Sequence, residues 1–134
     1  MTQAAPRKRF DRRRRLAGRA SFSAVYQARA RKSRGPLILH SRPNELEHCR
    51  LGLSVGRRVG NAVTRNLIKR RLREAFRLHE ADLPRPARGG YDIILGVRPH
   101  KPLPMARYAE LLAALADEAH LLWQRRASRS DRDG

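Results

Sequence analysis

The chain has 134 residues, 40% of them apolar, and a formal net charge of +19, because 31 Lys and Arg face only 12 Asp and Glu. This length suits one domain with a modest core, and the charge strongly attracts polyanions. The lone cysteine, Cys49, excludes an internal disulfide and a cysteine-based zinc site. No apolar run approaches the roughly 18 residues of a membrane span, and the basic start lacks the apolar segment of a secretory signal. We therefore expect a cytoplasmic protein that works on nucleic acid.

The two ends of the chain lack the periodicity of folded elements. Residues 1–15 are rich in Arg and Lys, which favours a disordered basic arm. The arm could settle against RNA or serve only solubility, and the sequence leaves both open. Residues 124–134 are polar and are expected to form a disordered tail, so residues 16–123 make up the single folded domain.

The first predicted helix spans residues 16–30, with Ser21 as a plausible N-cap. Phe22, Val25 and Tyr26 are spaced i, i+3, i+4 and share one stripe of this helix. Such a stripe usually packs into a core. Beside an open sheet, the same rings could instead stack on the bases of a single strand.

Two short strands are predicted after a basic turn at residues 31–35, the first at 36–41 and the second at 49–55. The second strand alternates, with three apolar side chains on one face. Gly52 and Ser54 lie on the other face and leave it unbulky. This is consistent with a ligand that approaches the sheet closely, or simply with solvent.

Residues 60–76, GNAVTRNLIKRRLREAF, predict a helix with one basic face. At about 100° per residue, one arc of its surface collects Arg65, Lys69, Arg73, Asn66, Arg77 and Arg70. The opposite, mostly apolar side can pack on a core. A fixed array of cations suits a phosphate backbone, although a merely solvated basic face is the alternative.

The loop before this helix places Arg57 and Arg58 between two glycines. Backbone N–H groups and the helix dipole make such a position a reasonable anion site. No Gly-Lys-Ser/Thr follows, so we reject a nucleotide-hydrolysing P-loop. Either Asn61 or Thr64 could cap the helix.

The remaining elements are a nearly continuous apolar strand at residues 91–97 and an amphipathic helix at 105–123. With room for one more short strand, the order predicts an α/β sandwich of a small sheet with helices. No carboxylate pair and no Ser/His/Asp or Cys/His set can be assigned. The chemistry that the chain offers is phosphate binding.

Residues 51–76 closely resemble the signature of the bacterial ribonuclease P protein subunit: a strand with L-x-S-V, a basic pair, G-N-A-V, and a cationic motif ending in R-x-x-F. An upstream R-L…F-x-x-V-Y motif and a D-I-I-x strand match as well, at Arg15, Leu16, Phe22, Val25, Tyr26 and Asp92 to Leu95. The resemblance covers roughly residues 15–123. It departs at Leu67, where the family usually has Arg, and Arg70 or Arg71 could partly replace that cation.

The resemblance implies a two-layer α/β sandwich with a four-stranded mixed sheet and a left-handed βαβ crossover made by the basic helix. It also implies that catalysis belongs to a large RNA subunit with bound Mg²⁺, that the protein binds no cofactor, and that the protein alone does not cleave RNA. The partners are then the catalytic RNA and precursor tRNA, whose 5′ leader enters a cleft between the sheet and the first helix.

Carried onto this sequence, the resemblance implies two sets of site residues. The set expected to bind the RNA subunit is Arg57, Arg58, Asn61, Arg65, Asn66, Lys69, Arg70, Arg73 and Arg77. The set expected to bind the leader is Phe22, Val25, Tyr26, Gly52 and Ser54.

Two other classes of protein fit the composition. A ribosomal protein is equally small, basic and tailed, and only the specific motif weighs against it. A DNA-binding regulator would place the basic helix in a major groove, but that helix offers few Asn, Gln or Ser side chains for reading base edges.

Overall fold

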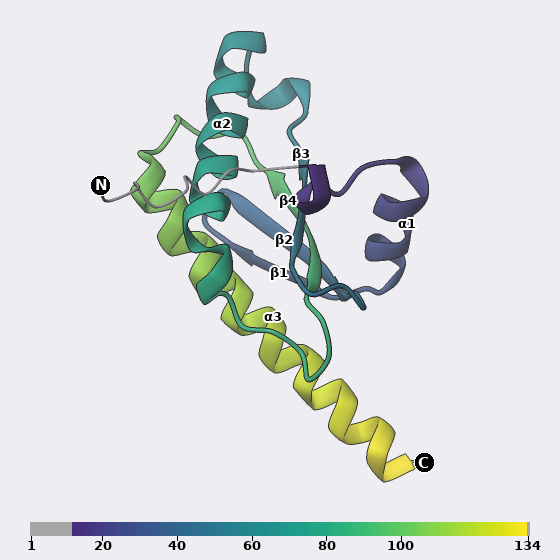
Figure 1. The fold of residues 1–134 in the computed structure, drawn as a ribbon. Coiled ribbons are helices and arrows are strands. Elements are labelled where there is room, and N and C mark those ends of the chain that lie inside the picture. The colour runs from purple at the N-terminus through teal and green to yellow at the C-terminus, as the bar shows by residue number, and fades with distance from the viewer. Residues whose placement is uncertain (1–11, 134) are drawn as a thin grey trace, which may run out of the picture.

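The computed structural model describes residues 12–133 of the chain (Figure 1). Its helices and strands are α1 (Arg19–Gln27), β1 (Arg31–Arg34), β2 (Leu37–Pro43), β3 (Arg50–Ser54), α2 (Ala62–His79), β4 (Tyr91–Val97) and α3 (Met105–Asp133). Short 3-10 turns lie at Arg12–Arg14, Arg57–Val59 and Glu80–Asp82. No helix within this range is long and apolar enough to cross a bilayer.

The four strands form one mixed sheet in the order β1-β2-β4-β3. The β1–β2 and β2–β4 pairs are antiparallel, and β3 runs parallel to β4. β4 is therefore an inner strand with helices on both faces, and its residues 91–95 are buried. This confirms the buried strand predicted from its continuous apolar run.

The prediction of a basic turn at residues 31–35 is wrong. Residues 31–34 form β1, which pairs with β2 from Arg31 opposite His40 to Arg34 opposite Leu37. The turn itself is short and includes Gly35 at φ +54°. A charged, exposed strand is usual at the edge of a sheet, where apolar alternation is not needed for burial, so the sequence pattern gave no strand signal.

Helices cover both faces of the sheet. The two-layer arrangement that we expected is therefore present, and the short helix α1 adds a partial third layer on the other face. Helices α2 and α3 lie on one face, and α1 lies on the other (Figure 1). The main core lies between the sheet and α2 and α3, where fully buried side chains include Ile68, Leu72, Phe76, Tyr108, Leu112 and Leu115. A smaller cluster holds α1 in place through Leu16, Val25 and Ile94, with Phe22 packed against it.

Helix α3 runs to Asp133, so the segment expected to be a disordered tail is helical through residue 133. Residues 124–133 contain no Gly or Pro and include the good helix formers Gln, Arg and Ala. Arg126 also anchors the segment, because its guanidinium donates to the carbonyls of Ala28 at 2.7 Å and Arg29 at 2.9 Å. These contacts join the end of α3 to the end of α1.

We expect Arg126→Ala to lower the free energy of unfolding by about 1–2 kcal/mol, because it removes two charged hydrogen bonds at a partly exposed site. Arg125→Ala is the matched control. Arg125 is exposed, so its loss should change stability by no more than about 0.5 kcal/mol. Urea unfolding followed by circular dichroism measures both, and equal effects would contradict an anchoring role for Arg126.

Candidate nucleic-acid interface

Helix α2 carries the predicted basic face. Asn61 is its N-cap, because the Asn61 side chain accepts a hydrogen bond from the Thr64 N–H at 2.9 Å, which decides between the two candidates. Arg65 is half-buried and its Nε donates to the Gly60 carbonyl at 3.1 Å. The remaining members are exposed or half-buried: Asn66, Lys69, Arg70, Arg73 and Arg77. The expected arc is therefore accessible along the helix.

Glu74 compensates one cation of this face. Arg77 Nε donates to Glu74 at 3.1 Å, and Arg77 also forms an ion pair with that carboxylate. The hydrogen bond from Arg77 lowers the pKa of Glu74, so both groups stay charged and neutralise each other. Within residues 12–133, no carboxylate forms an ion pair with Lys69, Arg70 or Arg73.

The N-terminal end of α2 extends beyond the rest of the body (Figure 1). Val63, an apolar residue in the first turn of α2, is consequently 78% exposed. Arg57 and Arg58 are exposed in the 3-10 turn just before this end. Both arginines thus lie close in the chain to the first turn of the basic helix.

Two of the residues expected to contact a single strand serve the packing of α1 instead. Val25 has no exposed surface, because it packs with Leu16 and Ile94. Gly52 is buried beneath the ring of Phe22, and a Cβ on Gly52 would lie 2.5 Å from Phe22 Cζ. The missing side chain at Gly52 therefore makes room for Phe22 and not for a ligand.

The rings of α1 remain partly open to solvent. Tyr26 is 41% exposed, and its ring meets that of His40 edge-on with the centroids 4.8 Å apart. Burial, followed by the charge of Arg31, lowers the pKa of His40. His40 therefore stays neutral at pH 7, and Tyr26 rests on an uncharged ring.

Ser54 is exposed on the same side of the sheet as α1, as the alternation predicted. It pairs with Gly96 of β4, which pairs with Ile38 of β2. Ile38 in turn lies opposite Ser33 of β1. In this row only Ile38 carries a bulky side chain, so an extended ligand could lie close to the backbone at Ser54 and Gly96.

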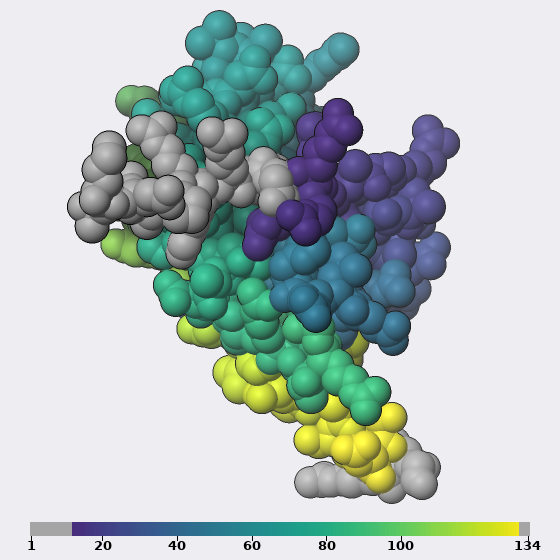
Figure 2. Space-filling view, in the orientation of Figure 1, coloured from purple at the N-terminus to yellow at the C-terminus, as the bar shows by residue number. Residues whose placement is uncertain are grey.

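A pocket of about 270 Å³ joins the α1 side of the sheet to the basic helix. Phe22 and Leu53 line it together with Arg15 and two cations of α2, Lys69 and Arg73. In Figure 2, the dark purple atoms of the first described residues lie between the teal surface of α2 and the blue-violet surface of α1. The aromatic and the cationic parts of the predicted site therefore meet in one cavity.

Sequence reasoning missed the position of Arg15, which it assigned to a disordered arm. Residue 15 forms a parallel bridge with Leu51, and the N–H of Leu16 donates to the Leu51 carbonyl at 2.9 Å. This pairing extends the sheet beyond β3 and holds Arg15 in the pocket. The R-L pair in the sequence was the only local signal of this contact.

Within residues 12–133, no three His, Cys, Asp or Glu side chains lie close enough together to hold a metal ion. The two buried carboxylates serve the scaffold. Asp92 accepts hydrogen bonds from Arg50 at 2.8 and 2.7 Å, and Glu80 accepts one from the Cys49 N–H at 3.0 Å. The accessible chemistry of this surface is cationic and aromatic.

The family model described as Ribonuclease P matches residues 10–124. The chain belongs to the ribonuclease P protein family. It is accordingly a component of the endoribonuclease that processes the 5′ ends of tRNA. The ribosomal-protein and DNA-regulator interpretations are thereby set aside.

Relatives in this family match most of the chain. The ribonuclease P protein component of Ectopseudomonas mendocina is 39% identical over 127 residues, which cover 92% of this chain and 87% of that protein. The corresponding component from Methylococcus capsulatus is 41% identical over 123 residues, covering 90% and 89%. Among solved structures, the Staphylococcus aureus ribonuclease P protein is similar with a TM-score of 0.67 and 30% identity, over 79% of this chain and 94% of that one.

We expect Gly52→Ala to lower the free energy of unfolding by about 1–3 kcal/mol, the usual cost of overpacking, because its Cβ would collide with the ring of Phe22. Gly56→Ala is the matched control, since a Cβ there would meet nothing within 4 Å. Urea unfolding compares the two. Phe22→Leu should cost less in the Gly52→Ala background than alone, and strictly additive effects would contradict the contact.

Proposed function

We propose that the basic face of α2 binds the RNA subunit of ribonuclease P, and that the side of the sheet beneath α1 receives the 5′ leader of precursor tRNA. The observation that carries this proposal is the pocket shared by Phe22 of α1 and by Lys69 and Arg73 of α2. A strand beside Phe22 would pass next to the cations that hold the RNA subunit. One protein would then bring leader and catalytic RNA together.

The contacts to the RNA subunit are assigned to the accessible cations and their polar neighbours. Phosphate contacts position an RNA without reading its sequence. Arg71 is not among them, because its guanidinium donates to the Leu103 carbonyl at 2.6 Å. Arg70 therefore replaces the cation absent at Leu67. The full set is Arg57, Arg58, Asn61, Arg65, Asn66, Lys69, Arg70 and Arg73, with Arg77 contributing less because Glu74 pairs with it.

For the leader, the contacting side chains are Tyr26, the exposed edge of Phe22, and Ser54. Aromatic rings stack on bases of any sequence, so this surface would accept many leaders. Arg15 joins the set because it lines the same pocket as Phe22. Val25 and Gly52 act only indirectly, by holding α1 and its rings in place.

Cleavage is assigned to the RNA subunit and to the Mg²⁺ that it holds. The protein contributes affinity and position, and it requires no cofactor of its own for that role. We also infer that the β3–α2–β4 unit is a left-handed crossover. The parallel pairing of β3 with β4 and the position of α2 between them in the chain support a crossover; its hand follows from the family resemblance.

Reconstitution tests the proposed function. The purified chain is mixed with a ribonuclease P RNA and a precursor tRNA at low Mg²⁺, and 5′ ends are mapped. We expect mature 5′ ends with both components and no cleavage by the chain alone. Cleavage that co-elutes with the protein and survives removal of RNA would contradict the assignment of catalysis to the RNA.

Replacing Arg65, Lys69 and Arg70 together with Ala should keep the fold and weaken binding of the RNA subunit. The slope of log affinity against log salt should shrink by about 0.7–0.9 for each phosphate that the variant no longer neutralises. Arg34, Lys101 and Arg107 replaced with Ala give a control with the same charge change at exposed sites outside α2. Equal slopes for the two triple variants would overturn the role of this face.

Tyr26→Leu should weaken binding of precursor tRNA to the holoenzyme and leave binding of mature tRNA unchanged. One base stack is worth about 1–3 kcal/mol, so affinity should fall roughly fivefold to a hundredfold. Tyr26→Phe keeps the ring and should retain most of the affinity. Thermal unfolding checks the fold first. If Tyr26→Leu weakened the binding of precursor and mature tRNA equally, the ring of Tyr26 would have a structural role and no contact with the leader.

A further inference from the structure

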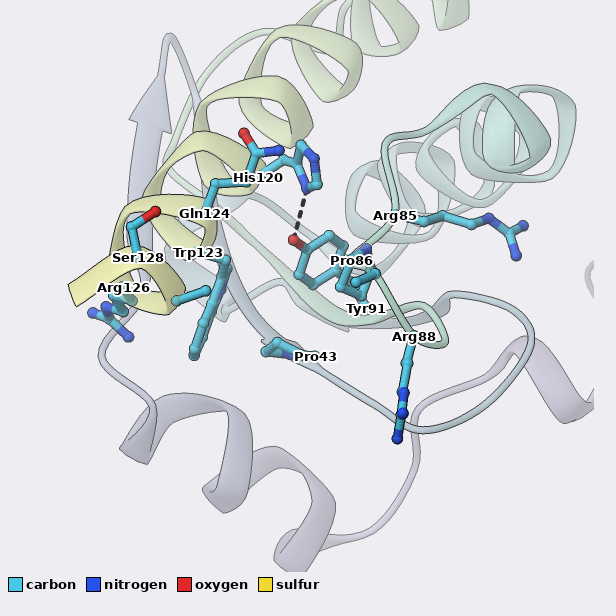
Figure 3. Close-up of a pocket in the computed structure, with 12 residues that line it drawn as sticks. Pro43, Arg85, Pro86, Arg88, Tyr91, His120, Trp123, Gln124, Arg126 and Ser128 are labelled. Carbon is cyan, nitrogen blue, oxygen red and sulfur yellow. Dashed lines mark hydrogen bonds between the residues drawn. The ribbon is translucent and has the colours of Figure 1, made fainter. Parts of the chain in front are cut away.

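A second pocket, of about 1070 Å³, is not used by any role assigned above. It lies between the C-terminal half of α3 and the loop before β4 (Figure 3). In that view Trp123 of α3 and Tyr91 of β4 stand on two sides of the space, with Pro43 and His120 at its other borders. This volume is slightly above the range of about 300–1,000 Å³ that is usual for small-ligand sites, so a nucleotide would fit with room for a neighbour.

The rings of this pocket are held in place before any ligand arrives. Trp123 donates from Nε1 to the Ser41 hydroxyl at 3.0 Å. The guanidinium carbon of Arg126 lies 4.7 Å from the centroid of the indole ring, and Arg126 is itself fixed by the end of α1. Trp123 keeps part of its surface exposed, so a second aromatic group could stack there at little cost in side-chain entropy.

Tyr91 forms the floor and adds no negative charge. Tyr91 as a whole is only 4% exposed, and its hydroxyl lies 2.8 Å from Nδ1 of His120. Burial raises the pKa of Tyr91 to about 12, so the phenol stays neutral at physiological pH. Pro43 and Pro86 complete a mostly apolar wall that carries no charge.

The charged residues that line this pocket are all positive. Three arginines line it, and none of the described lining residues is acidic. Two of the arginines are engaged: Arg85 pairs with Glu80, and Arg126 binds the carbonyls at the end of α1. Arg88 is exposed and has no hydrogen-bond or ion-pair partner within residues 12–133. The site therefore combines an accessible ring with an uncommitted cation.

We propose that this pocket binds a single-stranded RNA, with one base against Trp123 and a backbone phosphate of the same strand at Arg88. Base stacking next to a guanidinium is the usual chemistry of single-strand binding. An acidic peptide would satisfy Arg88 but would leave the indole without an aromatic partner. The pocket lies on the sheet face that carries α3, so this contact is separate from the leader surface beneath α1.

Trp123 is the only tryptophan in the chain, so its fluorescence reports occupancy of this pocket directly. The full chain is titrated with a ten-nucleotide oligoadenylate at low salt, and saturable quenching is expected. Arg88→Ala should reduce the salt slope by about 0.7, the value for one single-strand phosphate contact. Ala127→Glu places a carboxylate at the pocket and should weaken binding on the order of tenfold or more. Both positions are exposed, so the fold should persist.

Arg107→Ala and Ala113→Glu make the same charge changes at exposed positions nearer the start of α3, and should leave the quenching midpoint within about twofold. The proposal is overturned if no saturable quenching occurs, or if Arg88→Ala and Ala127→Glu bind as their controls do. It is also overturned if decaglutamate changes the fluorescence with the same midpoint as the oligoadenylate. That result would assign the pocket to an acidic protein partner.

Discussion

The packing of one stripe of α2 against the sheet decides where the cations of this protein point. Ile68, Leu72 and Phe76 have no exposed surface, and burying a side chain of this size contributes about 1.5–3 kcal/mol. These residues belong to one continuous helix, so fixing them also fixes the opposite side in solvent. Lys69, Arg70 and Arg73 are thereby held at helical spacing, although a net charge of +19 favours their separation.

The few acidic residues stabilise the scaffold more than they neutralise this surface. Asp92 and Glu80 are buried, and each has an arginine within hydrogen-bonding distance, because an unpaired buried carboxylate would be costly. Their partners, Arg50 and Arg85, are consequently structural. Glu74 is the exception, since it compensates Arg77 on α2 itself. Arginine thus has two uses in this fold. Buried carboxylates hold Arg50 and Arg85, and backbone carbonyls hold Arg71 and Arg126, whereas in the described part of the chain Arg70 and Arg73 of α2 are bound by neither.

The sequence could predict the elements whose burial follows a local period. The 3–4 spacing of α2 and α3, the alternation of β3 and the apolar run of β4 each reflect one face against one core. It could not predict contacts that depend on distant partners. Gly52 was expected to face a ligand because nothing local shows that Phe22, thirty positions earlier, lies over it. Arg126 likewise depends on carbonyls that lie 97 and 98 positions away.

Leu67 lies at the boundary between the packed side of α2 and the face that we propose to bind RNA. Its side chain is half-buried at the edge of the α2 stripe, where an apolar group gains burial and a cation would still reach solvent through its stem. Under the proposed binding of RNA by α2, a leucine in place of a cation here removes at most one phosphate contact, about 0.7–0.9 in the salt slope. Arg71 cannot compensate, because the Leu103 carbonyl holds its guanidinium. Arg70 is exposed on the next turn. Cations are therefore still present along the whole basic face of α2, and only the position of Leu67 lacks one.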